Sequence, residues 1–167
     1  MVSGRVNDIQ TTARTALKQV RELVSGMHAV TLRDEIRHAG QILAAADMEL
    51  ETSGPFEQMK ASPLVQNLLG LCLREAVTNV VKHSKATRCR IVLAEEASLL
   101  SLTVEDNGRG FDESACDAGS TGRGLLGMKE RLELVEGKLS FQARPGEGAR
   151  LTLSVPSVIK QTVRGGA

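Results

Sequence analysis

The amino-acid sequence predicts an α/β fold, and three patterns along the chain support this prediction. Residues 64–83 repeat apolar side chains at the spacing of one helix face, over a length that strands rarely reach. Residues 88–94 and 99–105 alternate apolar and polar side chains, as half-buried strands do. The same alternation returns at residues 138–143 and 149–155, after a further helical stretch at 125–135. Helices and strands are therefore expected to share one core.

The composition excludes several classes of protein. The 167 residues carry 21 Lys and Arg against 20 Asp and Glu, so no field of one sign favours nucleic acid or anionic lipid. No apolar run approaches the length that a bilayer requires, and the first residues have no signal-peptide pattern. Cys72, Cys89 and Cys116 form no C-x-x-C pair, which argues against a disulfide framework or a zinc site. A reducing, cytoplasmic location is expected.

Residues 6–27 predict an N-terminal helix with a single apolar stripe, formed by Ile9, Ala13, Leu17, Val20, Val24 and Met27. Such a stripe requires a partner, either a second copy of the chain or the rest of a longer helical bundle. The alternative is a surface helix that lies on its own domain.

A second helix is predicted to begin after Thr31, because Asp34 follows at the spacing of a capping box. Its buried side would consist of Leu32, Ile36, Ala39 and Leu43. Residues 47–51 alternate as a short strand with one wet face, and the Ser, Gly and Pro content of residues 52–63 predicts a loop.

Three polar residues follow one border of the helix predicted at residues 64–83. Glu75, Asn79 and Lys82 lie at positions i, i+4 and i+7, within roughly 60° of each other at about 100° per residue. They border a broad apolar side, so we expect them at the edge of a cleft. By the same count His83 falls within the apolar side and is expected in the core, whereas His28 and His38 are expected on the surface.

Residues 106–123 are predicted to be a mobile lid. They contain four glycines with Ser, Thr and Asp, and little that is bulky and apolar except Phe111. Cys116 is expected to be exposed within this lid. The helix at 125–135 would end at Gly137. A hairpin through residues 95–98 would make the strands on either side of it antiparallel, and the composition of residues 145–148 predicts a turn between the last two strands. Residues 157–167 are expected to fray.

Asp106 stands where a predicted strand gives way to glycines, in D-N-G-R-G-F at 106–111. A carboxylate beside backbone that carries no side chains can accept a hydrogen bond from an exocyclic amine, which adenine offers and guanine at that edge does not. The alternative is an aspartate that only starts a turn before Asn-Gly.

Glu75 and Asn79 supply an anionic and a neutral oxygen from adjacent helical turns, a pair suited to magnesium that keeps most of its waters. Lys82 can meet phosphate as a point charge. Gly122, Gly124 and Gly127 are predicted to open the following helix, where free backbone N–H groups can receive an anion. Taken alone, the pattern E-x-x-x-N-x-x-K is also found at the solvent-exposed border of an ordinary helix.

The ordered segments R-E-A-V-T-N-V-V-K-H at 74–83, D-N-G-R-G-F at 106–111 and G-R-G-L-L-G-M at 122–128 resemble the N box and the two glycine boxes of the ATPase domain of gyrase, heat-shock chaperones, histidine kinases and MutL. The amino-acid sequence of these segments most resembles that of the DesK and NarX-like sensor histidine kinases. This resemblance implies a Bergerat-type two-layer α/β sandwich, with three helices on one face of a mixed sheet and ATP beneath a flexible lid.

The resemblance also implies roles for individual residues. Asp106 would bind the adenine amino group, Asn79 would hold magnesium with possible support from Glu75, and Lys82 would meet the phosphates. Gly108, Gly110, Gly122 and Gly124 would shape the lid, and Arg123 and Leu125 would contact the nucleotide beside them. Ala149 departs from the pattern, because many relatives carry Thr there.

The predicted organisation is a remnant of a second dimerisation helix at 1–28, an ATP-binding catalytic domain at 29–156 and a disordered tail at 157–167. The phosphoaccepting histidine would lie on a first helix that this chain lacks, so self-phosphorylation is not expected. Implied partners are ATP or ADP, that histidine-bearing helix and a response regulator, and the parent kinase would be anchored in the inner membrane.

Two alternatives come from other functional classes. One is a stand-alone ATP-dependent binding module of the anti-sigma-factor kinase type, for which an N-terminal helix with an unpaired stripe would be superfluous. The other is an ATP-hydrolysing clamp of the gyrase kind, in which Glu75 would activate water and a further domain would supply a lysine.

Overall fold

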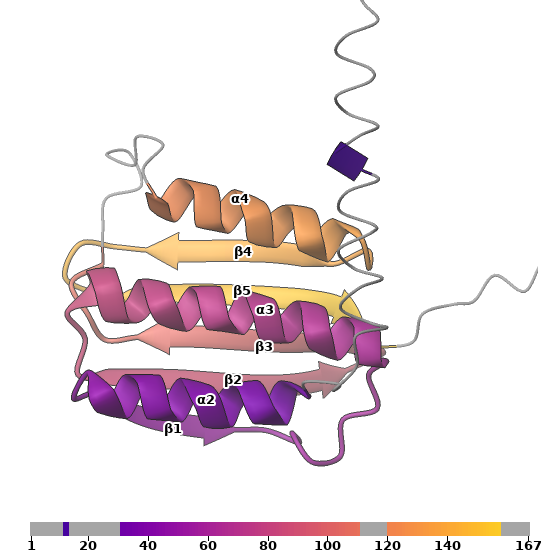
Figure 1. Cartoon of the computed structure of the whole chain (residues 1–167), viewed down its shortest axis with the longest axis horizontal. Helices are drawn as coiled ribbons and strands as arrows, with labels where there is room; N and C mark the ends of the chain where they lie inside the picture. Colours follow the sequence, from indigo (N-terminus) through magenta and orange to yellow (C-terminus); the bar gives the residue numbers. More distant parts are fainter. Residues whose placement is uncertain (1–11, 14–30, 111–119, 158–167) are drawn as a thin grey trace, which may run out of the picture.

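The computed structural model describes residues 12–13, 31–110 and 120–157, and in these the chain forms two layers (Figure 1). One layer is a five-stranded sheet in the order β1-β2-β3-β5-β4. Its strands are β1 (Glu49–Ser53), β2 (Arg88–Glu96), β3 (Leu99–Asp106), β4 (Lys138–Ala143) and β5 (Ala149–Pro156). The other layer consists of α2 (Leu32–Ala45), α3 (Pro63–Asn79) and α4 (Ser120–Glu133), which lie on one face of the sheet.

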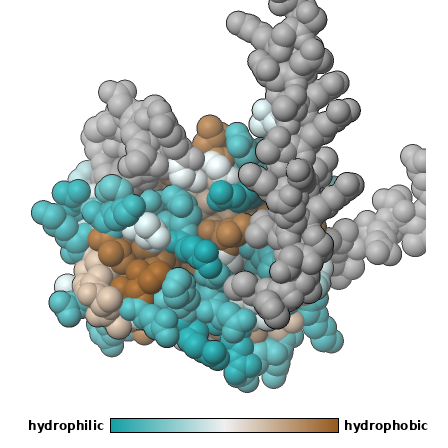
Figure 2. All heavy atoms as spheres, viewed as in Figure 1, coloured by the Kyte–Doolittle hydropathy of each residue, from teal (hydrophilic) through white to brown (hydrophobic). Residues whose placement is uncertain are grey.

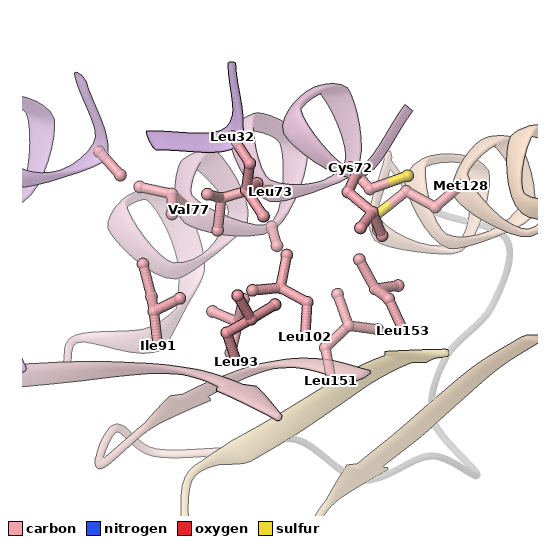
Figure 3. Packing of buried hydrophobic residues seen from close by; sticks show 14 of the residues in the cluster. Leu32, Cys72, Leu73, Val77, Ile91, Leu93, Leu102, Met128, Leu151 and Leu153 are labelled. Carbon is pink, nitrogen blue, oxygen red and sulfur yellow. The ribbon is translucent and has the colours of Figure 1, made fainter. Parts of the chain in front are cut away.

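The sheet is mixed, as the resemblance implied, because β1 runs parallel to β2 while the other neighbours are antiparallel. The alternation read from the sequence is confirmed: the inward residues of β2 and β3 are buried, namely Cys89, Ile91, Leu93, Leu100, Leu102 and Val104. Figure 3 shows how Leu73 and Val77 of α3 point toward these strands. Burial of this apolar surface is the main source of the fold's stability.

The face of the sheet that carries no helix is polar, and its charges compensate one another. Glu51 pairs in register with Arg90, Arg90 with Glu105, and Glu105 with Arg150, so acidic and basic residues alternate across four strands. The guanidinium of Arg150 lies 2.9 Å from the Glu105 carboxylate. Opposite charges on directly opposed positions stabilise a sheet modestly.

Helix α2 begins as predicted. The Asp34 N–H donates to the Thr31 hydroxyl at 3.2 Å, and the Thr31 N–H donates to the Asp34 carboxylate at 3.2 Å, which completes the capping box. The buried side of α2 also contains Glu35, which forms an ion pair with Arg74 of α3. This pair links α2 to α3 beside their apolar contacts.

The helix predicted at residues 64–83 changes its geometry before it ends. Residues Pro63–Asn79 are α-helical, and Val80–Ser84 form a π-helical turn, η1. A π-turn takes more residues than an α-turn, so the 100° step no longer holds beyond Asn79. The predicted orientations of Lys82 and His83 depend on that step, so the π-helical turn changes both.

Helix α4 begins at Ser120, five residues before the predicted start near Leu125, and ends at Glu133. The left-handed residue after it is Glu136, with φ 56°, and not Gly137. Gly137 matters for another reason: a Cβ there would lie 2.9 Å from Val155 Cγ1 and 3.0 Å from the Leu132 carbonyl oxygen. Of the residues predicted as a lid, 106–110 form the end of β3 and the loop that follows it, 120–123 are helical, and 111–119 lie outside the described residues.

Several predictions concern residues outside the described part of the chain. Of the N-terminal helix, only Thr12 and Ala13 are described, and both are helical and exposed. His28, Cys116 and residues 158–167 lie outside the described residues. In the part that is described, no helix is both long and apolar enough to cross a membrane. Hydrophilic residues cover much of the helical face, with hydrophobic residues exposed in patches (Figure 2).

Candidate functional site

A hollow lies between the helices and the sheet. It is bounded by α3 and its extension η1, by α4, and by strands β3, β4 and β5. Its empty volume is about 570 Å³ with the solvent at its mouth included. Most of its surface is apolar. The lining residues are Ala76, Asn79, Val80, His83, Ser84, Val104, Asp106, Gly110, Leu125, Met128, Phe141, Ala149 and Leu151.

Asp106 is the only carboxylate among the described lining residues. It ends β3, is 8% exposed, and its Oδ1 accepts a hydrogen bond from the Gly108 N–H at 2.8 Å. Burial raises the pKa of Asp106, and backbone N–H groups of Gly108 and Ala149 oppose that shift. The hollow therefore presents one acidic acceptor within apolar surroundings.

The loop that follows Asp106 is held by backbone contacts that only glycine permits. A Cβ on Gly108 would lie 2.2 Å from the Ser84 carbonyl oxygen at the end of η1. Gly110 has φ 59°, and a Cβ on it would lie 2.0 Å from the Arg144 carbonyl oxygen. Gly148 has φ 77°, and a Cβ on it would lie 2.0 Å from the Asp106 carbonyl oxygen. The loop is thus wedged between η1 and the β4–β5 turn.

Hydrogen bonds fix the same loop to its neighbours. The Arg109 N–H donates to the Ser84 carbonyl at 2.8 Å, and the Arg109 Nε donates to the His83 carbonyl at 2.9 Å. On the other side, the Gly146 N–H donates to the Arg109 carbonyl at 2.6 Å. Arg109 therefore satisfies carbonyl groups at the end of η1, where a helix leaves them unpaired.

Glu75 and Asn79 of α3 meet α4 at Gly124. A Cβ on Gly124 would lie 2.7 Å from Glu75 Oε1 and 3.6 Å from Asn79 Nδ2. The glycine therefore lets a carboxylate and an amide of α3 approach the backbone of α4. Asn79 also lines the hollow, whereas Glu75 is not among its lining residues.

The structure brings together only some of the residues singled out in the sequence. Asn79, Asp106, Gly110 and Leu125 surround one hollow, and Gly108 adjoins it through its hydrogen bond to Asp106. Lys82 is exposed and is not among the lining residues. Gly122 and Arg123 lie in the first turn of α4, and Gly124 follows them inside the helix.

The prediction of a core position for His83 is wrong. His83 is partly exposed and lines the hollow, because the π-helical turn rotates it away from the apolar side of α3. His38 is exposed as predicted. Cys72 and Cys89 are buried, which raises their pKa to about 11 and about 12, so both remain unreactive thiols.

Sequence reasoning missed several residues of the site. Met128, Phe141 and Leu151 line the hollow from α4, β4 and β5, and as single apolar residues they carry no signal beyond burial. Asn107, which is not among the lining residues, is predicted only as part of a turn, yet its side chain makes three hydrogen bonds. Its place between Asp106 and Gly108 was the available signal.

Comparison with known proteins finds relatives over most of the chain. Residues 64–159 match the family described as histidine kinase-, DNA gyrase B-, and HSP90-like ATPase. Sensor histidine kinase YvfT of Bacillus subtilis (strain 168) is 40% identical over 146 residues, which are 87% of this chain and 38% of that protein. Sensor histidine kinase DesK of the same organism is 40% identical over 152 residues, which are 91% of this chain and 40% of that protein.

Solved structures support the fold. The Acinetobacter baumannii histidine kinase AdeS matches with a TM-score of 0.60 at 13% identity, over 94% of this chain and 84% of that one. The histidine kinase domain from the Erythrobacter litoralis EL346 blue-light activated histidine kinase matches with a TM-score of 0.58 at 18% identity, over 75% of this chain and 61% of that one. The resemblance to DesK-like kinases is confirmed, and the chain belongs to the family of histidine kinase-, DNA gyrase B- and HSP90-like ATPases.

Proposed function

We propose that the hollow binds ATP with magnesium and presents it as the catalytic domain of a sensor histidine kinase. One observation carries the proposal: a single buried carboxylate, Asp106, shares a largely apolar hollow with Asn79, the amide-bearing residue of α3. An apolar slot with one acceptor suits a purine that carries an exocyclic amine.

In this proposal each wall of the hollow has its own task. Asp106 accepts the hydrogen bond of the adenine amine, and Val104, Met128 and Leu151 exclude water from the ring. Gly108 and Gly110 keep side chains out of the space beside Asp106. The nucleotide's phosphates are expected further along, toward Lys82 and the residues Gly122, Arg123, Gly124 and Leu125.

Magnesium is assigned to the Asn79 amide oxygen, with Glu75 in support. Among the described residues no three His, Cys, Asp or Glu side chains converge on one point, so a site made wholly of protein ligands is not the expectation. An amide with a nearby carboxylate fits a magnesium ion that keeps most of its waters and also binds phosphate oxygens. When bound, the metal would neutralise phosphate charge during phosphoryl transfer.

The chain spans 38% and 40% of the lengths of the two Bacillus subtilis kinases. In the proposal, this domain is therefore one part of a longer parent kinase. Residues 1–28 are the remnant of a dimerisation helix, residues 29–156 are the ATP-binding domain and residues 157–167 are a tail. The domain acts in the cytoplasm on a histidine-bearing helix of the parent, which then passes the phosphoryl group to a response regulator.

The decisive experiment for nucleotide recognition is Asp106→Asn. Calorimetry should show magnesium-dependent binding of ATP and not of GTP to the wild-type chain. In the variant, ATP binding should be weakened about tenfold or more, with an unchanged circular dichroism spectrum. Asp47→Asn is a matched control, because Asp47 is an exposed residue before β1. Retention of ATP affinity in Asp106→Asn would reject the adenine assignment.

A second experiment separates a kinase domain from a binding module. Labelled ATP with magnesium should leave this chain unlabelled, and should label a histidine-bearing two-helix hairpin of a DesK-like kinase that is added in trans. A stable phosphohistidine on His28 or His38 would show that the acceptor had been misplaced. No labelling of the hairpin at saturating ATP would favour the stand-alone binding module.

A further inference from the structure

The side chain of Asn107 makes three hydrogen bonds, although the residue is exposed. Its Oδ1 accepts from the Thr87 N–H at 3.0 Å and from the Arg88 N–H at 2.9 Å, and its Nδ2 donates to the Thr87 hydroxyl at 2.9 Å. A main-chain bond adds to these, from the Asn107 N–H to the Arg88 carbonyl at 3.3 Å. We call the three side-chain bonds the latch.

The latch lies outside the hollow, since neither Asn107 nor Thr87 is among the lining residues. Its partners are the last residue of the η1–β2 connection and the first residue of β2. Arg109 holds the other end of the η1–β2 connection through the carbonyls of His83 and Ser84. The segment after Asp106 is therefore attached to that connection at both of its ends.

Gly108 stands between these two attachments and donates its N–H to Asp106 Oδ1 at 2.8 Å. The position of that N–H depends on where Asn107 and Arg109 hold the backbone on either side. Arg109 keeps its main-chain bond to Ser84 whatever its side chain is, whereas the bonds of the latch to Thr87 need the amide of Asn107.

We infer that Asn107 is a positioning residue for Asp106, and that the latch sets how strongly the hollow prefers a purine with an exocyclic amine. The inference rests on the proposed function, because the preference is expressed through the Asp106 carboxylate. Without the latch only the main-chain bond from the Asn107 N–H to the Arg88 carbonyl, at 3.3 Å, holds the backbone on that side, so the direction of the carboxylate is less firmly fixed. A role confined to satisfying the N–H groups of Thr87 and Arg88 would leave the preference unchanged.

The test compares ADP with IDP, which has a carbonyl in place of the adenine amine and the same sugar and phosphates. The measured quantity is the ratio of the two dissociation constants, obtained by calorimetry on the full chain with magnesium. Asn107→Ala should lower the preference for ADP about tenfold, the equivalent of about one charge-assisted hydrogen bond. Thr87→Val, which removes only the hydroxyl partner, should lower it about threefold.

Two control variants keep the ratio at the wild-type value. Thr87→Ser retains the hydroxyl that Asn107 meets. Thr103→Val makes the same chemical change as Thr87→Val, at a residue whose hydroxyl lies 3.5 Å from that of Thr152 in the sheet. Thermal melts of all variants identify any that fail to fold, and Thr87→Val carries the test if Asn107→Ala does not fold.

Asp106→Asn distinguishes the two possible failures. If Asp106→Asn abolishes the preference for ADP while the folded latch variants keep the wild-type ratio, the latch has no positioning role and the proposed function stands. If the latch variants weaken ADP and IDP equally, the role of Asn107 is structural only and the inference is overturned. If Asp106→Asn keeps the wild-type ratio, the proposed function itself fails.

Discussion

The two walls of the hollow are held in place by different means. The helical wall, formed by Ala76, Asn79, Val80, His83 and Ser84, belongs to α3 and η1, and the side of α3 behind it is buried against the sheet. The sheet wall contains Asp106 and Gly110, which are held by backbone-to-backbone approaches too close for a Cβ.

This difference predicts different tolerance to substitution. Apolar cores accept changes in side-chain volume, at a cost in stability, without changing where the backbone runs. A glycine contact between two backbones has no side chain that can rearrange, so a substitution must move the chain itself. Substitutions in the sheet wall should therefore weaken nucleotide binding, whereas substitutions in the helical wall should mainly lower stability.

Gly110→Ala should have the largest effect. Gly110 combines φ 59° with a Cβ site 2.0 Å from the Arg144 carbonyl oxygen, so strain and overlap add to about 3 kcal/mol or more of lost stability. Urea denaturation measures the loss, and calorimetry with ADP should show binding weakened at least tenfold in the variant that remains folded.

Two further glycines separate the causes in this prediction. Gly146 has φ 77° and open space around its Cβ site, so Gly146→Ala should cost about 1–2 kcal/mol from strain alone. Gly127 lies within α4 with open space, so Gly127→Ala should stabilise by up to about 1 kcal/mol. Equal effects at Gly110 and Gly146 would show that the contact with Arg144 is unimportant.

Val77→Ala probes the helical wall. Val77 is fully buried between Glu75 and Asn79 in the sequence, and removal of two methyl groups should lower the free energy of unfolding by about 2 kcal/mol. The ADP dissociation constant, measured well below the melting temperature, should change less than about threefold. Val92→Ala, at a half-buried position on the open face, is the matched control and should cost less than about 1 kcal/mol. A loss of ADP affinity as large as that of Gly110→Ala would remove the contrast between the walls.

The two walls should also differ in how their contribution to nucleotide binding depends on pH, because Asp106 titrates and the Asn79 amide does not. Burial raises the pKa of Asp106 above its ordinary 3.8, so protonation of the folded protein begins at a higher pH than in the unfolded chain. The preference for ADP over IDP should fall as the pH drops through this raised pKa, by up to about tenfold per pH unit below it. Asp106→Asn should show no such dependence.

The same shift has the opposite sign for stability. A raised pKa favours the folded state at low pH, and this contribution is lost as the pH rises through the folded pKa. Asp106→Asn should therefore unfold at the same or a slightly higher urea concentration than the wild type at pH 7.5. A clear loss of stability would mean that the carboxylate has partners beyond the backbone N–H groups that oppose the shift.

Arg109→Ala should have the smallest effect. It removes the hydrogen bond from Arg109 Nε to the His83 carbonyl but leaves the main-chain bonds of residue 109, so the cost should stay below about 1 kcal/mol. The ADP dissociation constant should rise about twofold, measured beside Arg109→Lys, which can still donate to that carbonyl. A tenfold rise would show that the side chain, and not the glycine contacts, holds the two walls together.

Much of the fold could be predicted because period and capping are local properties. The alternation of Cys89, Ile91 and Leu93 predicts which side of β2 is buried, and Thr31 with Asp34 predicts where α2 begins. The positions of Lys82 and His83 could not be obtained this way, because a π-helical turn has no signature in the period of one short segment. The start of α4 was misplaced because its glycines suggested loop rather than helix.

By itself, the sequence determined the order of helices and strands, the buried side of most of them, and the residue types available for a nucleotide and a metal, since these follow from side-chain chemistry and spacing. Only the tertiary structure decided that Asp106 and Asn79 share a hollow, that His83 enters it while Lys82 does not, and that Asn107 grips the start of β2. Those relations join segments distant along the chain, and they exist only once burial of the apolar core has brought the helical layer onto the sheet.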